Sequence, residues 1–122
     1  MTAPKSFEEL EAWQAARELT NEVYALGRRE PLVRDLGLGD QLGRAAVSVM
    51  NNIAEGWESF HAAEKIQFYN GARRSCGEVR SMSYVLLDNR YISETEHDAL
   101  RERCVHCAQL VSGLIRFLKN RS

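Results

Sequence analysis

The chain has 122 residues, of which 44% are hydrophobic and 27% are charged, and its formal net charge is −1. This balance is typical of a folded globular protein and excludes a mainly disordered one. The near-neutral charge also argues against a general coat for nucleic acid, because such binding depends on a large excess of Lys and Arg. The length predicts a single domain over residues 1–122.

No segment of the sequence indicates export or a membrane. The N-terminal residues lead into charged ones without the apolar stretch of a signal peptide. No uncharged apolar run approaches the roughly 20 residues that span a bilayer. The cysteines are odd in number, which favours reduced thiols over a disulfide framework. We therefore expect a cytoplasmic protein.

The first predicted helix covers about residues 7–29. Ser6 and Glu9 have the spacing of a capping box, in which each side chain bonds a backbone N–H at the helix start. Gly27 and Pro31 are expected to end this helix. Its apolar residues recur with helical spacing at Phe7, Leu10, Trp13, Ala16, Val23 and Leu26.

A connector and a second helix follow. Residues 32–39 contain two glycines, which predict a connector. The second helix is expected over about residues 40–57. Its apolar face carries Leu42, Ala46, Val49, Met50, Ile53 and Trp57.

Two longer helices complete the predicted chain, over about residues 62–89 and 94–120. The last begins with a second capping box, at Ser93 and Glu96. Its apolar residues alternate spacings of four and three, which is typical of helices that pack about 20° from parallel. They are Leu100, Cys104, Cys107, Val111, Leu114 and Leu118.

Four helices joined by short connectors predict an all-α, antiparallel, up-down-up-down four-helix bundle. The last two helices have apolar faces wider than the roughly 100° that a bundle core needs. Either the monomer core is generously filled, or a second face is buried in a homo-oligomer. The additional apolar residues are Ile66, Tyr69, Tyr84, Leu87, Leu110, Ile115 and Phe117.

A stripe of polar side chains occupies a sector of about 100° on the second helix, opposite its apolar face. Ser and Asn are poor helix formers, so two adjacent asparagines in mid-helix suggest a use for them. We expect a semi-buried hydrogen-bonded contact, with a subunit or with a polar ligand; an ordinary solvated face is the alternative. The stripe consists of Gln41, Arg44, Ser48, Asn51, Asn52 and Glu55, with Glu78 of the third helix as a candidate partner for Arg44.

Arginines near the edge of the third helix's apolar face are candidates for binding phosphate, because guanidinium groups bond phosphate oxygens in pairs. Interspersed acidic residues such as Glu64 leave a solvated mixture as the alternative. A symmetric oligomer would repeat the site and increase its avidity. The candidate nucleic-acid-binding residues are Arg73, Arg74 and Arg80 of the third helix, together with Arg44 of the second.

The cysteines and histidines do not form a recognisable metal or catalytic motif. Cys76, Cys104 and Cys107 all fall on core faces, so we expect buried thiols that pack as small apolar groups. Glu94 and His97 have the spacing of one di-iron ligand pair, but no second pair accompanies them. We therefore expect no cofactor, no metal and no enzymatic activity.

Four motifs stand out along the chain: Ser6-Phe7-Glu8-Glu9-Leu10-x-x-Trp13, Gln41-x-x-Arg44-Ala45-Ala46, Asn52-Ile53-Ala54-Glu55-Gly56 and Ser75-x-x-Glu78. With them, the sequence over about residues 6–118 resembles the four-helix-bundle family of 23S rRNA-intervening-sequence proteins. The resemblance implies a bundle that assembles into a ring, typically a homopentamer. A related branch, the accessory proteins of diversity-generating retroelements, resembles a strongly basic ring that binds nucleic acid, and the net charge here departs from it.

Two hypotheses for function follow. The first is a homopentameric scaffold that contacts RNA or a ribonucleoprotein through the arginines named above. The alternative is a protein–protein adaptor without a role in nucleic-acid binding, in which the polar stripe around Gln41 and Asn51 meets a protein partner.

Overall fold

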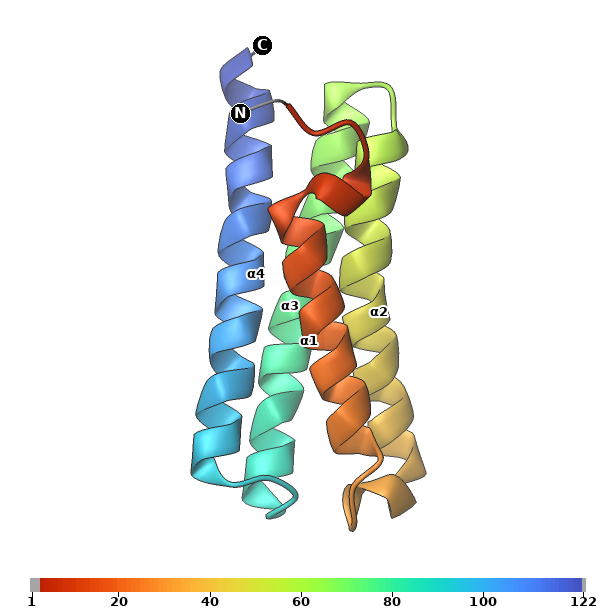
Figure 1. Ribbon diagram of the computed structural model, residues 1–122, viewed down its shortest axis with the longest axis vertical. Coiled ribbons are helices and arrows are strands. Elements are labelled where there is room, and N and C mark those ends of the chain that lie inside the picture. The colour runs from red at the N-terminus through yellow and green to blue at the C-terminus, as the bar shows by residue number, and fades with distance from the viewer. Residues whose placement is uncertain (1–2, 122) are drawn as a thin grey trace.

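A computed structural model describes residues 3–121 as four helices preceded or joined by short 3-10 turns, without strands. Figure 1 shows successive helices running in alternate directions. Each helix packs on the next one along the chain, and α4 packs back on α1. This arrangement is the predicted all-α up-down-up-down bundle. The helices are α1 (Glu11–Gly27), α2 (Leu36–Glu58), α3 (Ala62–Asp88) and α4 (Glu94–Arg121).

The core fills the length of the bundle and takes apolar residues from all four helices. Tyr69 and Ile115, which the wide apolar stripes could have placed on a second face, are buried in this core. Tyr84 and Phe117 remain exposed. The monomer therefore absorbs part of the surplus apolar surface and leaves the rest at the exterior.

The chain enters α1 differently from the prediction, and the capping box at Ser6 is wrong. Residues Phe7–Glu9 form a 3-10 turn, and Leu10 is extended, so α1 begins only at Glu11. The Ser6 side chain makes no capping hydrogen bond, and the Glu9 carboxylate accepts one from the backbone N–H of Lys5 at 2.9 Å. The extended backbone lets Leu10 turn into the core, where its burial stabilises the break.

The second helix begins at Leu36, within the segment that was expected to be a connector. Asp35 is its N-cap, because the Asp35 carboxylate accepts a hydrogen bond from the backbone N–H of Leu38 at 3.3 Å. The same carboxylate accepts a second bond from the Tyr91 hydroxyl at 2.9 Å. This cap explains why the glycines at 37 and 39 lie inside a helix rather than in a loop.

The capping box at the start of α4 is confirmed. The Glu96 backbone N–H donates to Ser93 Oγ at 3.1 Å, and the Ser93 N–H donates to Glu96 Oε1 at 2.9 Å. Arg29, just after α1, also forms an ion pair with Glu96. The Arg29 hydrogen bond and the cap lower the pKa of Glu96 to about 2. Along α4, Ile115 is buried in place of the predicted Leu114, which is only partly covered.

Two glycines allow α2 and α3 to lie close together. A Cβ atom on Gly56 would lie 2.5 Å from Cε1 of Tyr69, and one on Gly71 would lie 2.8 Å from Oδ1 of Asn52. Tyr69 is buried, so its ring cannot swing aside into solvent. A side chain at position 56 would therefore push the two helices apart, and one at position 71 would displace the Asn52 amide.

We predict that Gly56→Ala destabilises the protein by about 1–3 kcal/mol, because the added methyl group overpacks a buried contact. The measurement is urea-induced unfolding followed by circular dichroism. Gly77→Ala is the matched control, since a Cβ there meets no atom within 4 Å. Removing a mid-helix glycine at an open position is expected to stabilise by up to about 1 kcal/mol. Equal stability of the two variants would contradict the prediction.

Candidate functional site

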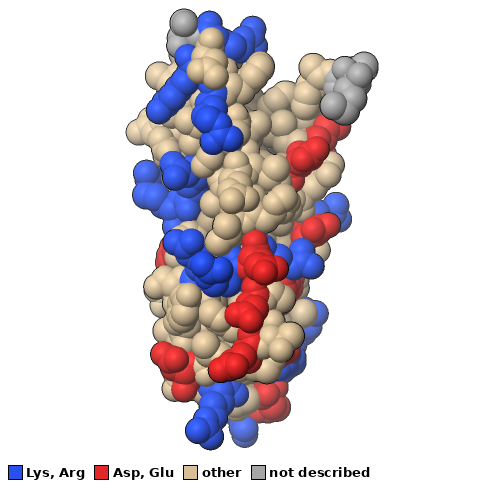
Figure 2. Space-filling view, turned by 90° about the vertical axis from the view of Figure 1, so that its left-hand side faces the viewer, with Lys and Arg blue, Asp and Glu red and all other residues tan. Residues whose placement is uncertain are grey.

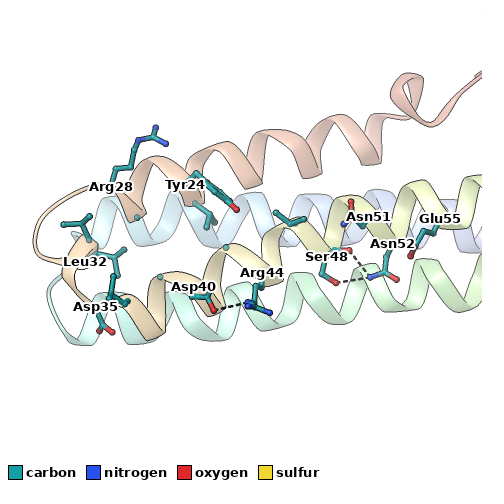
Figure 3. A pocket seen from close by; sticks show the side chains of 17 residues that line it. Tyr24, Arg28, Leu32, Asp35, Asp40, Arg44, Ser48, Asn51, Asn52 and Glu55 are labelled. Carbon is teal, nitrogen blue, oxygen red and sulfur yellow. Dashed lines mark hydrogen bonds and ion pairs between the residues drawn. The ribbon is translucent and has the colours of Figure 1, made fainter.

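The structure divides the predicted polar stripe of α2 into an inward part and an outward part. Ser48 and Asn52 are partly buried and point toward α3, as Figure 3 shows. Gln41, Asn51 and Glu55 are exposed. A helix carries side chains all around its axis, so a polar sector of this width borders a neighbouring helix on one side and solvent on the other.

The inward part is a hydrogen-bonded seam between α2 and α3. Asn52 Nδ2 donates to the backbone oxygen of Ser48 at 2.9 Å and contacts Ser48 Oγ at 3.0 Å. Ser48 Oγ in turn lies 2.9 Å from Ser75 Oγ, and Ser75 is buried. The predicted semi-buried hydrogen-bonded contact therefore joins two helices of the same chain. A contact of these residues with another subunit or a ligand stays a prediction.

Arg44 does not pair with Glu78, which was its candidate partner. Its Nε lies 2.9 Å from Oδ2 of Asp40, one turn earlier on the same helix, while Glu78 is exposed on α3. A carboxylate at this spacing reaches the guanidinium without crossing between helices. Both members of the pair are exposed, so the ion pair adds little stability.

A groove of about 790 Å³ runs between α1 and α2 (Figure 3). Its walls combine the outward polar residues with apolar side chains that are strongly exposed to solvent. Leu36 is 78% exposed and Tyr24 is 50% exposed. Tyr24 reaches from α1 to α2, where its ring lies 3.6 Å from the position of a Cβ on Gly43. The groove thus offers both apolar area and hydrogen-bonding groups to a partner. Residues 44, 48, 51, 52 and 55 of the stripe line it, but Gln41 does not.

A second groove, of about 430 Å³, lies between α3 and α4. Arg73, Arg74 and Arg80 line it, whereas Arg44 lines the other groove, so the four predicted nucleic-acid residues do not form one site. Within residues 3–121, the guanidinium groups of these three arginines take part in no hydrogen bond or ion pair. Figure 2 shows Lys and Arg gathered along one edge of the α4 side and at its upper end, beside a short column of Asp and Glu.

The cysteines are buried free thiols, as predicted. Cys107 Sγ contacts the Ala12 backbone oxygen at 3.7 Å, and Cys76 and Cys104 form part of the floor of the α3–α4 groove. Burial raises the pKa of Cys104 to about 12, so that thiol is protonated at neutral pH. Among residues 3–121, no three His, Cys, Asp or Glu side chains come together as a metal site. No helix in that range has the length and apolarity to cross a membrane.

The histidine of the Glu94 and His97 pair does not face solvent. It is buried in the first turn of α4, with its ring centroid 4.5 Å from that of Tyr84. No hydrogen-bond partner of Nε2 is found in the described part of the chain. The ring packs as an aromatic group between α3 and α4.

Sequence reasoning missed the apolar part of the α1–α2 groove and the partners of the seam. Leu36 and Val33 fell in a predicted connector, which has no helical periodicity to show that they line one face. Ser75 stood in a recognised motif, but only the crossing of α2 and α3 brings it to Ser48. The Asp35 cap was the available signal that the helix starts early.

The fold and the two grooves define a helical-bundle protein whose distinctive surfaces are suited to contacts with other molecules. The family model described as 23S rRNA-intervening sequence protein matches residues 8–113. The chain therefore belongs to that family, as the motifs predicted. A comparison with curated proteins gave no match.

We predict that Asn52→Ala destabilises the protein by about 1–2 kcal/mol, because it removes the amide from the seam and leaves Ser48 with fewer partners. Asn51→Ala is the control, since Asn51 has the same helix propensity and an exposed side chain. Urea unfolding of both variants measures the difference. Equal free energies of unfolding would show that the seam adds no stability.

Proposed function

We propose that this protein is a non-enzymatic, homo-oligomeric scaffold that binds RNA or a ribonucleoprotein through the α3–α4 groove. The observation that carries the proposal is the grouping of Arg73, Arg74 and Arg80 around this groove. Elsewhere on the surface, arginines such as Arg29, Arg34 and Arg103 pair with carboxylates. The three groove arginines keep their donors available to an external anion.

A phosphate chain suits this arrangement physically. Each guanidinium offers a planar fork of donors that matches two phosphate oxygens. Arg73, Arg74 and Arg80 span about two turns of α3, or roughly 10 Å, so they present charge along a line rather than at a point. The net charge of −1 does not oppose such binding, because the local field depends on how charges are distributed, and Figure 2 shows Lys and Arg gathered along one edge of the α4 side.

The arginine proposal is tested by replacing Arg73, Arg74 and Arg80 together with Gln. We expect the variant to bind a fluorescent RNA hairpin with single-stranded tails more weakly than the wild type at about 50 mM salt. Loss of three phosphate contacts would also reduce the slope of log K against log salt by about 2. Fluorescence anisotropy over a salt series measures both quantities.

The control for this experiment replaces Arg17, Arg90 and Arg101 with Gln, which changes the net charge equally at exposed positions outside both grooves. This variant is expected to keep most of the affinity. Equal losses in the two triple variants would mean that only net charge matters. No binding by the wild type would refute the RNA proposal.

The α1–α2 groove is the proposed contact with a second copy of the chain. The apolar side chain of Leu36 stays hydrated in a monomer, and Tyr24 adds a large amphipathic ring in the same groove. A groove that receives a different surface of the next copy makes a head-to-tail contact, and such contacts close into a ring when the rotation between successive copies divides a full turn. The proposed assembly is a homopentameric ring.

We predict that Leu36→Glu lowers the mass of the particle in solution to that of the monomer, because the new charge would be buried without a partner. Sedimentation velocity measures the mass. Gln109→Glu on the exposed face of α4 changes the net charge equally and is expected to leave the mass unaltered. A monomeric wild type would contradict self-assembly and leave this groove to a different protein, as in the adaptor alternative.

A further inference from the structure

The most exposed aromatic ring among the described residues lies at one end of the bundle. Phe60, between α2 and α3, is 94% exposed, and Phe117 near the end of α4 is 58% exposed. A ring left in water gains nothing for the fold, since its apolar area stays hydrated. The two rings are therefore candidates for contact with another molecule.

Arg121 connects the two aromatic residues. Its guanidinium carbon lies 5.3 Å from the ring centroid of Phe117, and it lines a shallow hollow of about 250 Å³ together with Phe60 and Lys65. The hollow lies between the start of α3 and the end of α4. We call Phe60, Lys65 and Arg121 the end platform. It combines a flat ring, a planar guanidinium and a second positive charge.

The end platform and the arginine groove belong to the same pair of helices. Both hollows lie between α3 and α4, which run antiparallel, so the groove is directed along the bundle toward the platform. Arg116 follows Val105 of the groove by about three helical turns and therefore lies on the same side of α4, between the two hollows. Figure 2 shows basic side chains along this route and at the upper end.

We propose that the end platform stacks an unpaired nucleobase of an RNA strand whose phosphates lie along the α3–α4 groove. This inference rests on the proposed function and names the form of RNA that the site takes. Unpaired bases stack on aromatic rings and on guanidinium planes, and every base has a face suited to this. In a duplex the same faces are covered by neighbouring base pairs, so the ring of Phe60 could not reach them.

The shape of the groove favours a strand over a membrane as the partner. An anionic bilayer also attracts basic residues with exposed aromatic rings. A flat bilayer, however, cannot follow arginines that line a concave hollow along the side of the bundle, whereas an extended sugar-phosphate chain can. The membrane is therefore the competing outcome in the test.

The test compares the wild type with Phe60→Ala on an oligouridine strand of about 12 nucleotides, a length that an extended binding site would cover. Loss of one stacked base is expected to weaken binding about 5- to 150-fold. The same substitution should not change binding of an abasic ribose-phosphate strand of equal length. Phe60→Trp should retain the wild-type affinity, and Phe60→Leu, which is apolar without a π-face, should behave as Phe60→Ala.

The outcomes separate this proposal from the one on which it rests. If the wild type binds oligouridine and Phe60→Ala binds it equally well, stacking at the end platform is refuted while the RNA proposal stands. If the wild type binds no RNA, both fail. If the wild type sediments with phosphatidylserine vesicles and Phe60→Ala does not, the ring serves a membrane surface and the stacking proposal is overturned. Because Phe60 is almost fully exposed, its substitution should leave the urea midpoint unchanged.

Discussion

The close approach of α2 to α3 is the constraint on which the rest of the structure depends. Gly56 receives the ring of Tyr69, Gly71 receives the amide of Asn52, and the Ser48 and Ser75 hydroxyls meet one helical turn beyond the Asn52 contact. Burial raises the pKa of Tyr69 to about 12, in keeping with a ring enclosed by protein. With these helices closely packed, the residues on their outer flanks have fixed positions, and the two grooves follow from them.

Each groove borders one helix of this central pair. The α1–α2 groove has exposed apolar side chains beside polar and charged ones of both signs, which suits a protein surface. The α3–α4 groove is smaller in volume and lined by arginines, which suits phosphate. A scaffold needs two such distinct surfaces, because self-assembly through one leaves the other available for a second partner. In a ring, the arginine groove would be repeated by every copy, so a modest affinity per site would be multiplied.

For the second helix, the sequence predicted that its polar side chains make a special contact, but not which of them make it. The adjacent asparagines indicated a special contact, and the contact exists for Asn52 but not for Asn51. Sequence gives the angle of each side chain about its helix axis, but not which neighbouring helix lies at that angle. The same limit separated Arg44 from Arg73, Arg74 and Arg80, since the two helices direct them to different grooves.

The sequence by itself determined the all-α class, the order of four helices, the burial of the cysteines and the cap of α4, because these depend on apolar periodicity and on contacts within a few residues. Its motifs also identified the family. Only the tertiary structure decided that Leu10 breaks the first helix, that Ser48 meets Ser75, and that Phe60 and Arg121 share one end of the bundle. The last two features join residues that are far apart in the chain. At Leu10, local helix preference competes with burial of the side chain, and the packing of the helices decides which of the two prevails.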